Sequence, residues 1–441
     1  ADAMKRVLLA GLLLTALSAF AQDQDISIVV DRGEEGAIDI AVVPFGWDRG
    51  GRPPVDLASI ITNDLNRSGV FAPMDRVALP ERPVGDRDIN FPVWRRKTSY
   101  LVVGKLIPKA QGRYTVQFRL FDVLKRDERL GLGGTQLTGL QFDRSESELR
   151  GTAHDISDRI YEAITGLPGA FNTRIAYITE HNGKNGTKDY SLKIADSDGF
   201  NATSVLNSRH PIMSPTWSPN GARLAYVSFE GRRASIYLQD LATGSRQRLS
   251  SFPGINGAPA FSPDGTRMAL TLSKDGNPEI YVLHLRSRKL TRLTRHPAID
   301  TEASWSADGR GLVFTSDRSG GPQIYWISAN GGEPKRLTFE GRYNAGASFS
   351  PNGREIAMVH NAGRGYQIAL MNLETRKVRV LTKSRLDDSP SFSPNGAMVL
   401  YSTTSNAGAT LAAVTTDGRA PQTLALRSGG LVRDPAWAPS K

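Results

Sequence analysis

A short aromatic motif recurs six times through the C-terminal part of the chain. The pattern is Pro-x-Trp/Phe-Ser-Pro-Asn/Asp-Gly, with departures in some copies, and its aromatic residue falls at positions 217, 261, 305, 349, 392 and 437. Each repeat predicts four short strands, the first two joined by a tight Asn-Gly or Asp-Gly turn. Four strands in about 40–45 residues are typical of one β-propeller blade.

The two ends of this repeat array complement each other. The sixth copy stops after the aromatic strand around Trp437, whereas residues 172–178 match the second strand of a repeat and have no aromatic strand before them. We therefore predict an all-β six-bladed β-propeller over residues 172–441, closed by pairing of both ends of the repeat array in one blade. Such closure removes the open sheet edges that favour aggregation.

The preceding part of the chain has a different pattern. Residues 22–165 predict an α+β N-terminal domain, with strands around 38–45 and 100–120 and a helix over 55–68. A second helix opens with a capping box of Ser145 and Glu148 and stops at Gly166. Residues 166–171 are expected to form a short linker.

Residues 1–21 have the features of a secretory signal peptide. A basic start precedes an apolar run over 7–17, and small residues end the segment at Ala21, where we expect cleavage. Residues 1–3 precede Met4 and are expected to be foreign to the natural chain. The apolar run is shorter than the roughly 20 residues that cross a bilayer. We therefore expect a periplasmic protein that does not span the membrane.

The composition argues against catalysis. Cysteine is absent, which excludes a disulfide framework, a thiolate zinc site and a catalytic thiol. The six histidines form no metal-binding motif, and the sequence lacks a Gly-x-Ser-x-Gly nucleophile elbow. We expect no catalytic residues, no metal and no cofactor.

The charge is unevenly distributed. The first 170 residues carry a net charge of −1 and the remainder +12. These basic residues are scattered, so we expect no nucleic-acid binding, and the surface is either simply solvated or faces an acidic protein.

Acidic residues precede two of the aromatic strands, as Asp300-Thr301-Glu302 and Asp387-Asp388. Carboxylates around a propeller channel can bind a cation, serve acid–base catalysis, or receive basic groups of a partner. They can also be solvated loop charges, and the sequence leaves these alternatives open.

From about residue 26 to the end, the chain resembles the TolB family of the Tol–Pal system. The most specific passage covers 154–158 (HDISD) and 171–177 (FNTRIAY), and segments 41–45 and 256–265 are also similar. Residue 255 departs from the pattern, because Ile stands where the family often has His. Other propellers share the turn motif, so the repeats alone are less specific.

The resemblance implies a non-enzymatic periplasmic protein that binds the lipoprotein Pal through one propeller face and supports outer-membrane integrity and constriction during division. It implies that an N-terminal segment binds TolA, for which the apolar residues are Ile26, Ile28, Val29 and Val30. This segment is expected to dock in one state and to be loose in the other, with a permanent edge strand of the small domain as the alternative. Other outer-membrane proteins are further expected partners, and we expect a monomer.

The resemblance places Pal contacts in the loops before the aromatic strands, and the shared face of all six loops extends the set. The partner-binding residues predicted in this way are Met213, Asn256, Gly257, Ala258, Asp300, Thr301, Glu302, Tyr343, Asn344, Asp387, Asp388 and Arg433. Glu302 is expected to matter more for binding than for folding. The alternative function is a propeller enzyme that acts on cell-wall sugars or peptides.

Overall fold

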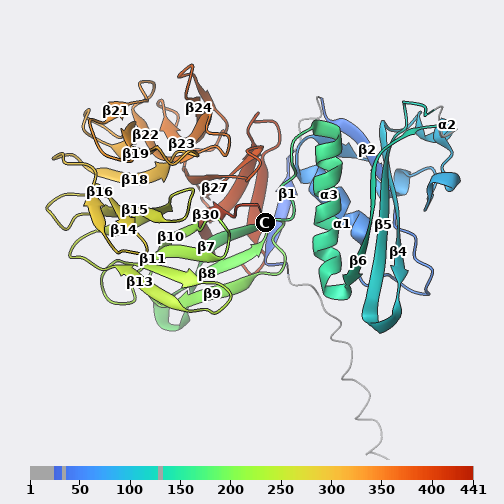
Figure 1. Cartoon of the computed structure of the whole chain (residues 1–441), viewed down its shortest axis with the longest axis horizontal. Helices are drawn as coiled ribbons and strands as arrows, with labels where there is room; N and C mark the ends of the chain where they lie inside the picture. Colours follow the sequence, from blue (N-terminus) through green and yellow to red (C-terminus); the bar gives the residue numbers. More distant parts are fainter. Residues whose placement is uncertain (1–23, 32–35, 128–132, 441) are drawn as a thin grey trace, which may run out of the picture.

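The computed structural model describes residues 24–31, 36–127 and 133–440, which form an N-terminal domain beside a larger β-propeller (Figure 1). The predicted signal peptide over 1–21 lies outside these residues. Within the described part of the chain, none of the helices combines the length and the apolar character needed to cross a membrane.

The N-terminal domain is one mixed sheet with two helices on one face. The strand order is β3-β2-β4-β5-β6, in which β2 is parallel to β3 and β4 and the remaining pairs are antiparallel. The strands are β2 (Ile38–Val42), β3 (Phe71–Pro73), β4 (Tyr100–Pro108), β5 (Arg113–Asp122) and β6 (Thr135–Ser145). The helices are α1 (Leu57–Arg67), α3 (Leu149–Thr165) and the short α2 (Phe91–Trp94).

Helix boundaries follow the capping chemistry of the sequence. The Asp56 side chain caps α1 by accepting a hydrogen bond from the backbone of Ser59 at 3.1 Å. The predicted capping box of Ser145 and Glu148 is present in the turn before α3, and Gly166 ends α3 with a φ of 76°. The buried faces of α1 and α3 pack on the sheet around Leu65 and Ile156, as the helical periodicity predicts.

In the described part of the chain the propeller has six blades. Blade 1 contains β30 (Leu431–Trp437), β7 (Arg174–Asn182), β8 (Lys188–Asp196) and β9 (Thr203–Ser208). Blade 2 contains β10 (Ile212–Trp217), β11 (Arg223–Ser228), β12 (Ser235–Asp240) and β13 (Arg246–Ser250). Blade 3 contains β14 (Asn256–Phe261), β15 (Arg267–Leu272), β16 (Glu279–His284) and β17 (Leu290–Arg292). Blade 4 contains β18 (Asp300–Trp305), β19 (Gly311–Ser316), β20 (Gln323–Ser328) and β21 (Lys335–Arg336); blade 5, β22 (Tyr343–Phe349), β23 (Glu355–Asn361), β24 (Gln367–Asn372) and β25 (Val378–Val380); blade 6, β26 (Asp387–Phe392), β27 (Met398–Ser405), β28 (Gly408–Thr415) and β29 (Gln422–Leu426).

The repeated motif supplies the inner strand of each blade and, in blades 2 to 6, the first turn as well. In blade 2 the Ser218 hydroxyl accepts a hydrogen bond from the backbone of Arg223 at 2.9 Å, and Gly221 has a φ of 65°. The same serine contact recurs at Ser262, Ser306, Ser350 and Ser393. The motif therefore encodes a hydroxyl-braced turn that needs glycine for its left-handed residue.

The ring closes as the ends of the array predict. β30 pairs antiparallel with β7, and Trp437 lies opposite Ile175. The six inner strands contact one another in the cycle β10-β14-β18-β22-β26-β30-β10. The prediction of a six-bladed propeller closed by both ends of the array is confirmed.

The N-terminal strand joins the propeller. β1 (Ile26–Val30) pairs antiparallel with β29 and becomes the fifth strand of blade 6, with Ile26 opposite Leu426. The alternative of an edge strand in the small domain is therefore wrong, because the described sheet of that domain does not contain β1.

Candidate functional site

The inner strand of every blade carries a β-bulge near the propeller axis. Each bulge holds one residue with positive φ, and five of the six are not glycine: Ser214, Ala258, Glu302, Gly346, Ser389 and Asp434. Such a conformation costs a non-glycine residue about 1–3 kcal/mol. Strain is thus concentrated in a ring around the axis, a placement typical of functional surfaces.

Hydrogen bonds between blades hold these bulges. Glu302 Oε2 accepts from the Thr315 hydroxyl at 2.9 Å and from the backbone of Gly346 in the next blade at 3.1 Å. Asp434 Oδ2 accepts from the backbone of Ser214 at 3.0 Å in the same way. The Glu302 side chain therefore has a structural task, which corrects the expectation that it matters mainly for binding.

Three carboxylates near the axis have altered acidity. Desolvation raises the pKa of Glu302, and the charge of Asp388 adds to this effect. Desolvation also raises the pKa of Asp388 and of Asp434. Solvent reaches Glu302 and Asp388 along the axis, yet the surrounding wall limits their hydration. Sequence reasoning missed Asp434, although it occupies the same repeat position as Glu302.

Four of the predicted partner-binding residues are buried at the start of their inner strands: Asn256, Asp300, Asn344 and Asp387. The Asn256 amide donates to the carbonyl of Phe252 at 2.7 Å, and Asp300 pairs with Arg318 at 2.7 Å. Asn344 and Asp387 likewise bind residues of the loops before them. Because these four side chains are buried, a partner cannot contact them directly, and they hold the conformation of the loops instead.

The other predicted residues lie at or near the surface. Met213, Gly257, Ala258 and Thr301 are half-buried beside the bulges, and Asp388 is exposed. The ring of Tyr343 packs edge-on against Tyr366 at 5.0 Å, and burial together with Glu302 and Asp388 raises its pKa to about 12. Arg433 lies 3.6 Å from Glu180. The structure thus brings these residues to one end of the propeller.

Exposed apolar side chains surround that end, which we call the loop face because it carries the loops that lead into the inner strands. They are Phe252, Ile255, Ile299, Phe339, Tyr366 and Leu386, and Phe339 is 70% exposed. Apolar residues grouped on exposed loops are typical of interaction sites. Sequence reasoning missed them because it followed strand periodicity; apolar residues inside loops would have been the signal.

The β1 segment is held from several sides. Ile26 is fully buried in the core of blades 1 and 6, whereas Val29 is 65% exposed and Ile28 and Val30 are half-buried. The neighbouring Asp25 accepts from the Tyr177 hydroxyl at 2.7 Å and pairs with Lys193 at 3.1 Å. The segment therefore docks through its N-terminal end.

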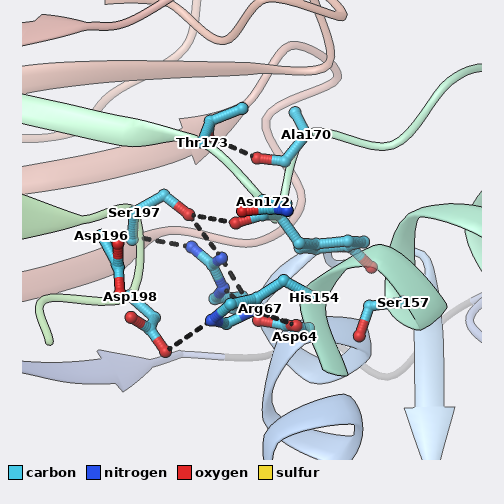
Figure 2. A network of polar contacts seen from close by, with 12 residues as sticks. Asp64, Arg67, His154, Ser157, Ala170, Asn172, Thr173, Asp196, Ser197 and Asp198 are labelled. Carbon is cyan, nitrogen blue, oxygen red and sulfur yellow. Dashed lines mark hydrogen bonds and ion pairs between the residues drawn. The ribbon is translucent and has the colours of Figure 1, made fainter. Parts of the chain in front are cut away.

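A buried polar network joins the two domains (Figure 2). Asp64 Oδ2 lies 2.6 Å from His154 Nδ1, and both side chains come from the helices of the N-terminal domain. From the propeller, Ser197 accepts hydrogen bonds from Arg67 at 2.8 and 2.9 Å, and Asp198 pairs with Arg150. Sequence reasoning missed this network, because Asp64 and His154 are 90 residues apart and belong to no common motif.

The charges of this network fit an ion pair. Burial alone would raise the pKa of Asp64, but His154 and Arg67 hold it below its usual value. Burial would lower the pKa of His154, yet Asp64 and Asp198 raise it above its usual value. Among the described residues, Asp64, His154 and Asp198 are the one group of possible ligands close enough together to share a metal ion. The direct contact and the two flanking guanidiniums already neutralise them, so the site favours an ion pair.

The closed ring, the N-terminal domain of one sheet and its helices, and the loop face define a two-domain β-propeller protein. Residues 161–441 match the TolB beta propeller domain, and residues 26–129 match the TolB amino-terminal domain. The chain is 56% identical to the Tol-Pal system protein TolB of Thioalkalivibrio sulfidiphilus, over 99% of both chains. The corresponding protein of Nitrosococcus oceani is 58% identical over 97% of this chain and 96% of that protein.

A solved structure agrees with these relatives. The crystal structure of TolB from Acinetobacter baumannii superposes with a TM-score of 0.86 at 42% identity, covering 94% of this chain and all of that one. The chain belongs to the TolB family, and it is a Tol–Pal system component.

Proposed function

We propose that this chain is a periplasmic protein-binding component of the Tol–Pal system, which binds Pal through its loop face and TolA through the β1 segment. By these contacts it supports outer-membrane integrity and constriction during division, and it acts as a monomer. Other outer-membrane proteins are further candidate partners. The observation that carries the proposal is the loop face itself, where exposed apolar residues surround a strained ring with acidic groups.

Pal binding is expected to centre on the apolar residues of the loop face. Phe339 and Leu386 project from neighbouring loops and are 70% and 51% exposed, so a partner that covers them removes apolar area from water. Asp388 lies at the centre, where it can receive a basic group of the partner. Aromatic anchors near the centre of an interface carry much of its binding free energy.

The Phe339→Asp variant tests this surface. It should weaken Pal binding at least tenfold in calorimetry, because burial of a carboxylate against apolar contacts is unfavourable. Val77→Asp is the matched control, since Val77 is 88% exposed on the N-terminal domain. Both variants should melt like the parent. Equal Pal affinities of Phe339→Asp and the parent would remove the loop face from the proposal.

TolA binding requires β1 to be accessible. β1 is the outermost strand of its blade and pairs with one neighbour, so its release leaves the ring closed. In the proposed switch, β1 is docked in one of two states, Pal-bound or Pal-free, and released in the other. This difference couples the Pal site to the TolA site.

Amide exchange on residues 26–31, with and without Pal, tests the switch. Protection should differ between the two states, and deletion of residues 22–31 should abolish TolA binding and change Pal affinity by about 5- to 150-fold. Equal protection in both states would reduce β1 to a structural strand.

A further inference from the structure

Arginine side chains fill two of the seams between propeller blades. Arg174, the first residue of β7, places its guanidinium 4.9 Å from the ring centre of Trp217 and donates to the carbonyl of Gly221 at 2.9 Å. Arg267, the first residue of β15, does the same with Trp305 at 4.6 Å and with Gly309 at 3.4 Å. In each case the arginine covers the aromatic residue of the next inner strand.

The seam between blades 4 and 5 lacks this filling. Gly311 is the first residue of β19 and therefore stands where β15 has Arg267. The indole of Trp326 lies over Gly311, since a Cβ built there would be 2.6 Å from its atoms. Blade 3 has Val282 at the position of Trp326, as the strand registers show. Blade 4 thus has a Gly–Trp pair at the positions where blade 3 has an Arg–Val pair.

This replacement leaves an open groove of about 540 Å³. Its apolar lining consists of Trp326, Leu337, Phe349 and Leu373. Cations surround it, namely Arg310, Lys335, Arg336 and Arg376, while Asp308 is the one acidic residue in the described lining. The Trp326 side chain is half-buried, so part of its ring faces the groove.

The groove lies on the turn face, which is the face that carries the Asn/Asp-Gly turns. Residues Asp308 and Gly353 of two such turns contribute to its lining. The strands that border it, β19, β21 and β22, are at the side of the propeller away from the N-terminal domain (Figure 1). The groove is therefore separate from the docked β1 strand. It adjoins the loop face at Arg336, whose guanidinium lies 4.8 Å from the ring centre of Phe339.

The charges around the groove indicate what kind of ligand it can bind. A guanidinium would reproduce the Arg267 contact, but four cations around the groove repel it. An acidic chain is attracted by the same cations, and one apolar side chain can enter between Trp326 and Phe349. Gly353 corresponds to Gly309, so its carbonyl lies where a peptide N–H can replace the arginine donor.

We propose that the groove between blades 4 and 5 binds an acidic peptide segment of a partner protein, which inserts a single apolar side chain against Trp326. This site is additional to the proposed Pal and TolA surfaces and does not depend on them.

Nuclear magnetic resonance on the full mature chain can test the site directly. The probe is a synthetic ten-residue peptide with a central Phe flanked by Asp and Glu. The chain has six tryptophans, and the indole N–H signal of Trp326 can be assigned from the Trp326→Val variant. The peptide should shift this signal selectively, and higher salt should weaken binding.

Variants then distinguish an effect on peptide binding from an effect on folding. Gly311→Arg combined with Trp326→Val copies the filled seam of blade 3, so it should melt like the parent and bind the peptide at least tenfold more weakly. Lys335→Glu with Arg376→Glu should also weaken binding at least tenfold. Arg286→Glu with Lys289→Glu is the matched control, because both residues are exposed on blade 3.

Three results would overturn the proposal. One is equal peptide affinity in the parent and the filled-seam variant. Another is equal binding of a peptide with Lys in place of Asp and Glu, or with Ala in place of Phe. The third is a Trp326 shift with oligogalacturonate but not with the acidic peptide, which would assign the groove to an acidic sugar.

Discussion

His154 contributes to folding at the point where both helices of the N-terminal domain meet the propeller. Its side chain is 2% exposed and bridges Asp64 and Asp198, which lie in different domains. Removal of one partner from a buried ion pair costs about 3–5 kcal/mol, because the remaining charge stays buried. The imidazole therefore contributes to the coupling between the domains, together with the contacts of Arg67 to Ser197 and of Arg150 to Asp198.

We predict that His154→Ala lowers the free energy of unfolding by about 3–5 kcal/mol, measured by urea denaturation. The change leaves the Asp64 carboxylate buried with Arg67 as its remaining described ionic partner. His210→Ala is the control, since His210 is exposed. If the two variants lose similar stability, the network does not hold the domains together.

The same pair predicts a pH dependence. The pKa of His154 is raised from 6.5, so its stabilising effect is complete below about pH 6.5 and is lost as the pH rises through the raised value. The pKa of Asp64 is lowered from 3.8, so its effect is complete above about pH 3.8 and is lost under more acidic conditions.

The stability difference between the parent and His154→Gln should therefore be largest between about pH 4 and 6.5 and should shrink at higher pH. The His154→Gln variant serves as the reference because other groups add to the pH dependence. Asp158, Asp196 and the carboxylates near the propeller axis also have raised pKa values, so they too make the folded state less stable as the pH rises. A difference that does not change from pH 5 to 9 would mean that His154 has the same pKa in the folded and the unfolded chain, and a difference that grows with pH would mean that His154 is neutral in the fold.

At the scale of elements, local patterns predicted the strands and helices better than their partners. The strands expected around 100–120 and the capping box at Ser145 correctly predicted β4, β5 and the start of α3. The partner of β1 could not be predicted, because Ile26 is buried against blades 1 and 6, far away in the sequence. The role of the loop face in partner binding stays a prediction, and the buried positions of Asn256 and Asp387 depend on loop conformations that the sequence does not reveal.

Glu302 shows how one side chain joins two such elements. It links the bulge of β18 to that of β22 through Thr315 and Gly346. Glu302→Lys should lower the melting temperature by several degrees, roughly 1–3 kcal/mol. The Thr315 hydroxyl loses its acceptor, the N–H of Gly346 is left with Thr315 Oγ1 as its acceptor, and the lysine ammonium is itself a donor that cannot accept either bond.

Glu302→Gln is the matched variant, since its amide oxygen can still accept both bonds, and it should melt close to the parent. Differential scanning calorimetry decides this, and a Lys variant as stable as the Gln variant would show that the bridge between blades 4 and 5 contributes little.

For the whole molecule, stability depends on closing the ring. β30 supplies the inner strand of blade 1, and the Trp437 indole donates to the Thr173 hydroxyl at 2.9 Å. The Trp217 indole of blade 2 donates to the carbonyl of Ala436 at 3.0 Å. The backbone N–H of Trp437 also donates to the Ser391 hydroxyl of blade 6 at 2.9 Å, so the last strand contacts both neighbouring blades as well as pairing within its own.

We predict that removal of residues 434–441 destabilises the propeller by more than about 4 kcal/mol, beyond the range of most single substitutions. The deletion uncovers the edge of β7 and exposes the core around Ile175. Deletion of residues 22–31 is the control, because it also removes one strand, β1, but from the outer edge of blade 6. Scanning calorimetry should show a much larger loss for the C-terminal deletion, together with aggregation through the open edge. Equal losses for the two deletions would mean that the ring gains no particular stability from its closure.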